Sequence, residues 1–392
     1  MDAYEAIVIG GGPSGATAAN ELAKKGKKVA FIDKAGRIKP CGGAIPPRLI
    51  VDFDIPESQV VAKIRTARMI SPTARKVDMP IENGFVGMVD RENFDEFLRQ
   101  RACKAGAKAY TGTFLKIERL SNKILVHYRE KKSGKDKVLE THAIIAADGA
   151  RSNVVRSEMP GGREIPYVIA YHEIIKAPKQ ESYDPDRCDV IYDGKISPDF
   201  YGWIFPHGKV ASVGMGTGVN GIDLKAATSE LRKSAGLSEC ETIRREGAPI
   251  PLRPLDKWDN GKDLVLAGDA AGVVAPSSGE GIYYAMVGGQ EAANAIISFL
   301  ENEDPTKLKL ARKQFMANHR TVFKVLGAMQ SAYYRSDDRR ERFVSLCKDK
   351  DVQKLTFEAY MNKKLMRTKF LAHVKIMLKN LAHLTGVIKA TS

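Results

Sequence analysis

The first 33 residues constrain the fold more than any other part of this 392-residue chain. A short apolar run, residues 4–10, leads into the hexapeptide Gly-Gly-Gly-Pro-Ser-Gly, which has the pattern G-x-G-x-x-G. An alanine-rich stretch over 16–25 and a second apolar run over 28–33 follow. This order predicts a buried parallel strand, a helix and a second strand.

The glycines and the acid that ends the second run indicate a dinucleotide site. The first glycine allows a tight turn, the middle one lets the backbone approach a pyrophosphate, and the last lets helix and strand pack closely. The helix start offers N–H groups and a positive dipole end to phosphates. A carboxylate 18 residues further on can accept hydrogen bonds from a ribose. The residues assigned to the cofactor here are Gly10, Gly12, Pro13, Ser14, Gly15, Asp33 and Lys34. A motif so near the N-terminus favours FAD, while NAD(P) stays open at this point.

The composition is that of a globular protein without membrane spans. Hydrophobic residues make up 43% of the chain and charged residues 28%. No apolar run reaches the roughly 18 residues of a membrane-spanning helix, and we expect no signal peptide. The five cysteines are widely spaced without C-x-x-C, which argues against disulfides, zinc or iron–sulfur clusters and favours a reducing, cytoplasmic compartment. We therefore expect no metal site.

The formal net charge of +15 suits an anionic partner. No nucleic-acid-binding module is recognisable, so we expect no nucleic acid. Much of the positive charge lies late in the chain, where residues 370–384 carry apolar side chains on one helical stripe. Two interpretations of this stripe stay open, a helix that caps the core and an amphipathic helix that rests on an anionic membrane.

A single thiol, Cys41, lies in a loop rich in glycine and proline, residues 37–47. Most free cysteines are inert and buried. A functional role is favoured here because the loop directly follows the nucleotide-binding unit and because Gly42 and Gly43, followed by Ala44, allow close approach to a flat ligand.

Later segments repeat the pattern of a strand followed by a polar turn and a helix. A helix predicted over 90–105 begins near Arg91, which is either a phosphate or ribose ligand or a surface residue. Strands are predicted over 114–127 and 137–147, the second ending in Asp148-Gly149. A strand over 263–268 precedes a helix over 282–300 whose start can bind an anion. The further cofactor candidates here are Gly268, Asp269, Pro276, Gly279, Gly281 and Ile282.

Residues 165–216 contain several short β-type runs, and helices are expected over 305–334 and after 339. Alternate residues of a strand share a face, so Tyr201, Trp203 and Phe205 point the same way. They are either an aromatic core stripe or one apolar wall of a substrate cavity.

Three elements in order, the G-x-G-x-x-G of residues 10–15, Asp148-Gly149 and Gly268-Asp269, resemble the FAD-binding signature of the p-hydroxybenzoate hydroxylase superfamily. Within it, residues 39–47 (Lys-Pro-Cys-Gly-Gly-Ala-Ile-Pro-Pro), 69–72 (Met-Ile-Ser-Pro) and 201–206 (Tyr-Gly-Trp-Ile-Phe-Pro) are similar to geranylgeranyl reductases. The stretch 353–360 most resembles the chlorophyll and bacteriochlorophyll branch.

The resemblance implies an α/β (α+β) fold, with a Rossmann-like FAD-binding domain, an inserted antiparallel-sheet substrate domain and a helical C-terminal region. We assign the domains as follows: 1–75, 90–160 and 255–300 to FAD binding, 76–89 and 161–254 to the substrate sheet, and 301–392 to the helical region.

The implied activity is reduction of the geranylgeranyl group of (bacterio)chlorophyll, or of geranylgeranyl diphosphate, to phytyl, with FAD as cofactor and NADPH as donor. An isolated alkene needs a proton from the site together with hydride from the reduced flavin. The catalytic candidates are Cys41, Tyr201 and Trp203, with Tyr201, Tyr283 or Tyr284 as alternatives to the thiol acid. Three rival interpretations are an aromatic-ring hydroxylase, an archaeal-type lipid reductase and a flavoprotein that only carries prenylated pigment.

Overall fold

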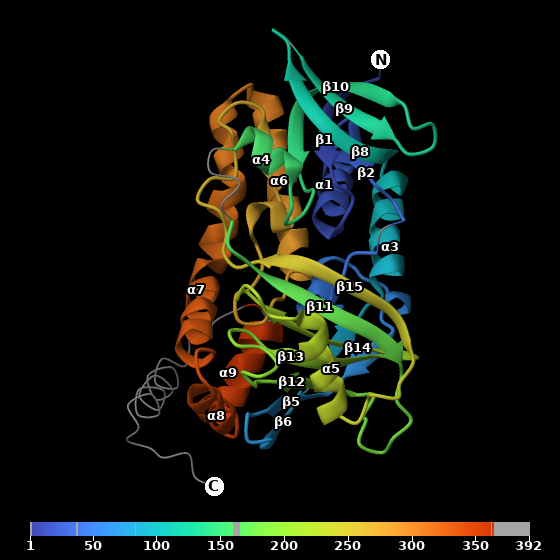
Figure 1. Cartoon of the computed structure of the whole chain (residues 1–392). Coiled ribbons are helices and arrows are strands. Elements are labelled where there is room, and N and C mark those ends of the chain that lie inside the picture. Colours follow the sequence, from blue (N-terminus) through green and yellow to red (C-terminus); the bar gives the residue numbers. More distant parts are fainter. Residues whose placement is uncertain are drawn as a thin grey trace. The chain divides into compact units, whose positions relative to one another are not determined.

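The computed structural model describes residues 2–36, 38–82, 84–121, 123–159, 165–361 and 363 (Figure 1). The chain forms two compact units, each assembled from three segments. Unit 1 comprises Met1–Lys39, Arg91–Tyr167 and Pro249–Arg320, and unit 2 comprises Pro40–Asp90, Val168–Ala248 and Thr321–Ser392.

Unit 1 is built on a six-stranded sheet. Five of its strands run parallel, in the order β8 (Lys108–Arg119), β2 (Val29–Asp33), β1 (Ala3–Ile9), β10 (Asp136–Ala146) and β16 (Leu264–Leu266). The sixth, β9 (Ile124–Glu130), is antiparallel to both β8 and β10. The central parallel strands are almost wholly buried, as their continuous apolar runs predict.

Helix α1 (Pro13–Lys24) packs between α3 (Arg91–Lys104) and α6 (Ile282–Asn302) in unit 1 (Figure 1). Proline at its first position suits a helix start, and the alanines after it allow close packing. At the α1–α6 contact, a Cβ on Gly289 would lie 2.2 Å from the Ser14 carbonyl oxygen. The short α4 (Asn153–Glu158) follows β10, and η2 (Gly268–Ala271) follows β16.

The prediction of one strand over 114–127 is wrong. The backbone N–H of Leu120 donates to the Lys123 carbonyl at 2.9 Å, and this turn separates β8 from β9. Polar residues between Leu120 and Lys123 favour such a turn over a continuous strand.

Unit 2 contains a seven-stranded sheet and a three-stranded sheet. The larger has the order β15 (Thr242–Pro251), β11 (Tyr167–Lys176), β14 (Val210–Thr217), β13 (Gly202–His207), β12 (Arg187–Ile191), β5 (Thr66–Ile70) and β6 (Lys76–Pro80). The smaller has the order β3 (Ala44–Ile45), β7 (Val86–Met88) and β4 (Ala62–Ile64). The predicted antiparallel sheet contains a parallel pair, since β12 runs parallel to β5. A parallel neighbour is possible because a long stretch of chain separates the two strands.

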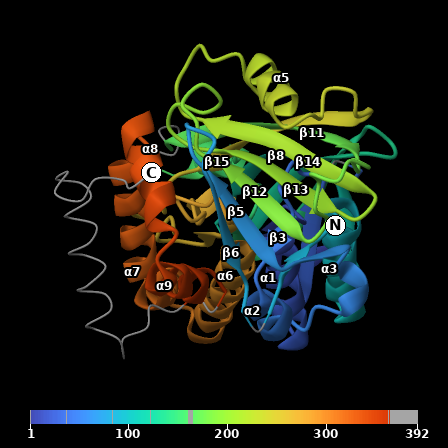
Figure 2. The ribbon, with the colours of Figure 1, turned by 90° about the horizontal axis from the view of Figure 1, so that it is seen from below.

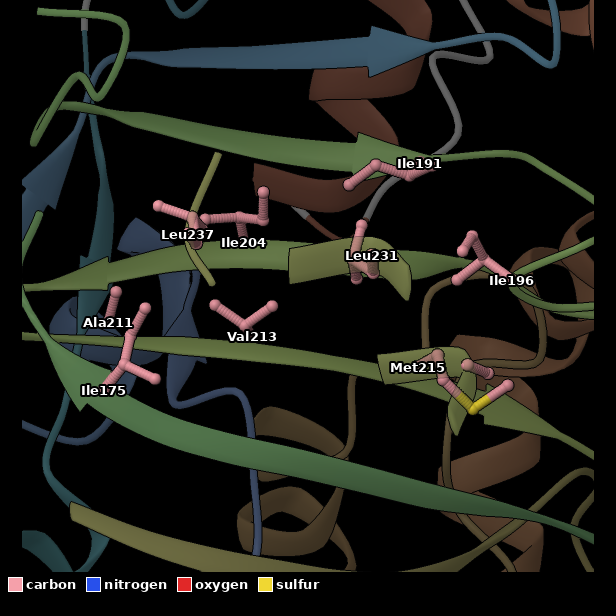
Figure 3. Packing of buried hydrophobic residues seen from close by; sticks show 10 residues of the cluster. Ile175, Ile191, Ile196, Ile204, Ala211, Val213, Met215, Leu231 and Leu237 are labelled. Atoms are coloured by element: carbon pink, nitrogen blue, oxygen red, sulfur yellow. The ribbon is translucent and has the colours of Figure 1, made fainter. Parts of the chain in front are cut away.

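One face of the seven-stranded sheet is an apolar core covered by α5 (Leu224–Ser234), a helix that we did not predict (Figure 2). Ile204, Val213 and Ile175 from three neighbouring strands pack there against Leu231 (Figure 3). Because side chains alternate along a strand, Trp203 and Phe205 point to the opposite face.

The two units differ from the predicted domain boundaries at several segments. Residues 249–254, which we assigned to the substrate sheet, and residues 301–320, which we assigned to the helical region, belong to unit 1. We assigned residues 40–75 to the FAD-binding domain, but they belong to unit 2, where they supply β3, β4 and β5. The short α2 (Pro47–Asp52) and η1 (Glu57–Gln59) lie in the same segment.

The expected helix over 305–334 is divided into η3 (Pro305–Lys309) and α7 (Leu310–Tyr333), followed by α8 (Asp337–Leu346) and α9 (Lys350–Met361). The apolar stripe predicted over 370–384 lies outside the described residues. Among the helices that the structure describes, none combines the length and the hydropathy that crossing a bilayer requires.

Candidate functional site

The glycine-rich loop in unit 1 joins β1 to α1 with almost no space for side chains. Gly10 has φ +106°, and a Cβ there would lie 2.3 Å from the Ala147 carbonyl oxygen. A Cβ on Gly15 would lie 1.8 Å from the Gly10 carbonyl oxygen. A Cβ on Gly12, in contrast, would have no protein atom within 4 Å. The loop is therefore closed on the protein side and open at Gly12, as an approach to pyrophosphate requires.

The N-terminus of α1 presents polar groups that the protein itself leaves unused. Gly12 is the N-cap, and no side chain caps the helix. The Ser14 hydroxyl is buried without a hydrogen-bond partner and lies beside Gly268, whose added Cβ would be 3.0 Å from that oxygen. A buried hydroxyl at a helix start is suited to donate to an anion.

Asp33 stands at the end of β2 and holds the glycine loop. One carboxylate oxygen accepts from the backbone N–H of Gly11 at 2.8 Å, and the other accepts from Ala35 at 2.9 Å. Arg99, on α3, donates to the Gly11 carbonyl at 3.3 Å and has a guanidinium nitrogen 3.8 Å from Asp33. Lys34 is exposed.

Arg99 is a site residue that our sequence reasoning missed. The sequence contained a pattern that could have identified it. Arg99 lies eight positions after Arg91 and four after Asp95, so the three share one helix face. It brings a positive charge to the loop where a diphosphate is expected.

A second polar group forms around Asp269, which follows β16. Its carboxylate pairs with Lys39 at 2.5 Å, and an added Cβ on Gly281 would lie 3.8 Å from it. Gly281 is the N-cap of α6, and the Glu280 carboxylate accepts from the Tyr283 N–H in the first turn of that helix at 3.1 Å. Gly279 has φ +63°, while Pro276 and Ile282 are buried beside this turn.

Two predicted cofactor residues have partners within the chain. Asp148 accepts hydrogen bonds from the Ser152 hydroxyl at 2.5 Å and from two backbone N–H groups at the start of α4. Burial raises its pKa, against the lowering effect of these bonds. Gly149 has φ +85° in the same turn. Arg91 forms two 2.7 Å hydrogen bonds with Asp95.

Unit 1 thus fits a dinucleotide such as FAD. Gly10 and Gly15 close the loop on the protein side. A pyrophosphate needs close backbone approach and a donor, which the open space at Gly12 and the buried Ser14 hydroxyl provide. Sugar hydroxyls need acceptors, which the carboxylates of Asp33 and Asp269 provide.

In unit 2 the loop that contains Cys41, called the thiol loop below, is held against one strand. The Cys41 sulfur accepts from the backbone N–H of Gly43 at 3.4 Å, and the Val89 N–H donates to the Gly43 carbonyl at 2.9 Å. An added Cβ on Gly42 would lie 3.1 Å from the Phe205 ring. Cys41 is half-buried, and Ala44 begins β3.

His207, at the end of β13, anchors the same loop and was not predicted as a site residue. Its Nε2 lies 3.0 Å from the Gly42 carbonyl, which can only accept, so Nε2 carries the hydrogen. Burial lowers the pKa of His207 to about 4, although the Gly42 carbonyl and Asp90 act to raise it. The imidazole is therefore neutral near pH 7. The sequence pattern that could have identified His207 is the alternation of side-chain direction along the strand, which continues from Phe205 to position 207.

The aromatic residues predicted on one face of β13 do lie together. Ring centroids are 6.1 Å apart for Tyr201 and Trp203, and 6.2 Å apart for Trp203 and Phe205. Burial raises the pKa of Tyr201, and the neighbouring Tyr334 and Cys41 raise it further. Since Phe205 contacts the thiol loop, unit 2 brings Cys41, Tyr201 and Trp203 into one cluster.

The alternative acids on α6 lie in unit 1. Tyr283 and Tyr284 form an edge-to-face pair with ring centroids 5.4 Å apart. Burial raises the pKa of Tyr284 well above its usual range, which makes its phenol a poorer acid. The described residues contain no group of three His, Cys, Asp or Glu side chains suited to a metal ion.

Comparison with known proteins identifies close relatives. The sequence profile of the family "Pyridine nucleotide-disulphide oxidoreductase" matches residues 4–231. The chain is 64% identical to a geranylgeranyl diphosphate reductase of Rhodobacter capsulatus, over 98% of both chains. It is 36% identical to the geranylgeranyl diphosphate reductase of Synechocystis, over 96% of this chain and 97% of the other. A geranylgeranyl bacteriochlorophyll reductase-like protein of Thermoplasma acidophilum has the same fold, with a TM-score of 0.82 at 24% identity over 97% of this chain and 100% of the other.

Proposed function

The chain belongs to the geranylgeranyl diphosphate reductase family, and on that premise we propose that it saturates double bonds of a geranylgeranyl group to give phytyl. It is an FAD-dependent oxidoreductase. The substrate is free geranylgeranyl diphosphate or the geranylgeranyl tail of (bacterio)chlorophyll, and NADPH is the electron donor. The full-length identity of 64% carries this proposal and favours it over the aromatic hydroxylase, the archaeal-type lipid reductase and the pigment carrier.

In this proposal the groups of unit 1 hold FAD. The open approach at Gly12 and the hydroxyl of Ser14 receive the pyrophosphate, and Arg99 adds a positive charge. Asp33 and Asp269 accept hydrogen bonds from sugar hydroxyls, for which Asp269 exchanges its pairing with Lys39. When bound and reduced, FAD supplies the hydride equivalent that an alkene carbon accepts.

The proton comes from Cys41. Reduction of an isolated alkene adds a hydride to one carbon and a proton to the other, so the site must hold an acid. The Cys41 sulfur accepts the Gly43 N–H, and its own S–H hydrogen is not used in that bond. The raised pKa values of Tyr201 and Tyr284 support the thiol over either phenol.

The aromatic face of β13 excludes water and holds the isoprenoid. Tyr201 and Trp203 are buried, and Phe205 lies against the thiol loop. Apolar rings give an isoprenoid chain contact area, and their exclusion of water protects positive charge that develops as the alkene is protonated.

The decisive experiment compares Cys41→Ala with the wild type and with Cys103→Ala, a control at an exposed thiol. Each FAD-loaded protein is incubated anaerobically with NADPH and geranylgeranyl diphosphate, and mass spectrometry counts the hydrogen pairs gained. We expect Cys41→Ala to lose alkene reduction at least 100-fold while its flavin still bleaches, since a positioned acid contributes about 10²–10⁴-fold. Full activity in that variant would reject the thiol as the acid.

The same assay separates substrates, donors and rivals. Geranylgeranyl bacteriochlorophyll replaces the diphosphate in a parallel reaction, and the faster turnover identifies the preferred substrate. Turnover without oxygen excludes a hydroxylase. Absence of flavin bleaching with NADPH would reject that donor and lead to reduced ferredoxin as the next one tested.

Peripheral contact with an anionic photosynthetic membrane, from a cytoplasmic location, is part of the proposal and rests on the basic, amphipathic pattern of residues 370–384. Flotation with anionic liposomes would compare the full chain with one lacking residues 366–392. Undiminished binding by the shortened chain would reject this segment as the contact.

A further inference from the structure

The face of the unit 2 sheet that carries the aromatic cluster also contains a buried polar chain. Ser212 is fully buried, and His172 is 3% exposed. The indole Nε1–H of Trp203 donates to the Ser212 hydroxyl at 3.0 Å. That hydroxyl lies 2.8 Å from His172 Nδ1, and His172 Nε2 lies 3.0 Å from a carboxylate oxygen of Glu246. Three strands, β13, β14 and β11, and the edge strand β15 contribute one member each.

The directions of these hydrogen bonds follow from counting donors and acceptors. The indole nitrogen only donates, and the Glu246 carboxylate only accepts. With the hydrogen of the imidazole on Nε2, Nδ1 accepts from the Ser212 O–H, and Ser212 in turn accepts from Trp203. With a hydrogen on Nδ1 instead, the buried hydroxyl would lose this acceptor for its own hydrogen. The chain therefore runs in one direction, from Trp203 through Ser212 and His172 to Glu246.

Two further observations show that this arrangement is tightly enclosed. An added Cβ on Gly214 would lie 2.4 Å from the His172 Cβ and 2.6 Å from the Trp203 ring, so only glycine leaves space for both side chains. Glu246 is held in turn by Arg244 at 2.7 Å. Although burial acts to raise the pKa of Glu246, its hydrogen bond with His172 and the charge of Arg244 bring it below its usual range.

We propose that the His172–Glu246 pair is a positioning device that fixes the Trp203 indole through Ser212, and thereby sets the shape of the isoprenoid-binding wall. Trp203 is the residue that contacts substrate, and the other three are positioning residues. This inference rests on the proposed function for the identity of the ligand, although not for the existence of the hydrogen-bonded chain. An apolar substrate offers no polar group that could orient an indole, so the protein must do it.

The test uses ¹⁵N-tryptophan-labelled, FAD-loaded protein. The chain has only two tryptophans, so its spectrum contains two indole N–H signals, and Trp203→Phe assigns the one that disappears. Ser212→Ala should shift the Trp203 indole signal upfield and speed its hydrogen exchange, while the Trp258 signal stays in place. His172→Gln keeps an acceptor and a donor on one planar group, whereas His172→Leu keeps neither. We expect the Trp203 signal to be nearly wild-type in the first and displaced in the second.

Kinetics give a second, independent reading. Ser212→Ala should lower kcat/KM for the geranylgeranyl substrate about tenfold, the effect of one lost buried hydrogen bond, while reduction of the flavin by NADPH is unchanged. In a Trp203→Phe background the same substitution should have no further effect, because the donor is already absent.

An unmoved Trp203 signal in both Ser212→Ala and His172→Leu would overturn the inference, and so would additive kinetic effects in the double variant. If the wild type reduces no geranylgeranyl substrate, the proposed function fails, whereas the spectra still decide whether the chain of hydrogen bonds holds Trp203.

Discussion

Replacement of His207 by glutamine should remove an acid sensitivity of the fold. Glutamine retains an N–H that can donate to the Gly42 carbonyl, but it does not titrate. In the wild type, burial lowers the pKa of His207 to about 4, while Asp90 acts to raise it and His172 and Arg244 act to lower it. An unfolded histidine titrates near 6.5.

The sign of the effect follows from these two values. Between about pH 4 and pH 6.5 the unfolded chain binds a proton that the native imidazole does not, so the free energy of unfolding falls as the pH is lowered through this window. Above it the contribution of His207 is fully present. With the two pKa values given, the wild type should lose about 2 kcal/mol between about pH 7.5 and about pH 5 from this residue alone.

The assay is urea unfolding of both FAD-loaded proteins at the two pH values, followed by circular dichroism. Carboxylates and the other histidines titrate in both proteins, so their effects cancel in the difference between them. We expect the wild-type free energy of unfolding to fall by about 2 kcal/mol more than that of His207→Gln. Parallel pH dependence of the two proteins would refute the lowered pKa of the half-buried His207.

Five other substitutions test the two units. Gly15→Ala forces a Cβ to within 1.8 Å of a carbonyl oxygen and should yield a colourless, destabilised protein, whereas Gly12→Ala should fold and lose FAD. Absorbance would report the bound flavin, and thermal unfolding would report the stability. Arg99→Leu should weaken FAD binding about tenfold in an apoprotein titration, with an effect that diminishes at high salt, and salt-independent loss would contradict an electrostatic role. Arg232→Met removes the 2.5 Å partner of the buried Glu173 carboxylate, which retains Arg245 at 3.0 Å, and it also removes hydrogen bonds to the Leu237 and Cys240 carbonyls. It should cost about 3 kcal/mol in urea unfolding, part of which Glu173→Leu should restore, and a loss that persists in full would place the cost in the carbonyl contacts.

Local patterns determined the nucleotide-binding half well. The glycine loop and its flanking strands were predictable because each requirement acts within about 30 residues, through turn geometry, apolar runs and a helix start. Errors arose where a turn had to be recognised inside an apolar stretch, as between β8 and β9, and where a helix had weak signals, as with α5.

The aromatic stripe of β13 was predictable as a face, because alternation is a property of one strand. The sequence did not predict on which side of the sheet this stripe lies or which segment packs against it. Phe205 meets the thiol loop from about 160 residues earlier in the chain, and no local pattern records that pairing.

Short-range sterics and periodicity in the sequence predicted the dinucleotide loop and the aromatic face of residues 201–205, and they made Cys41 a candidate. The family and the fold class came from the resemblance of the sequence motifs to a known family. Only the tertiary structure decided that Arg99 approaches the glycine loop, that His207 holds Gly42, and that His172 reaches Trp203 through Ser212. These contacts depend on strand register and on glycines that leave space between side chains distant in sequence, and the environment that sets a histidine's charge exists only after the chain has folded.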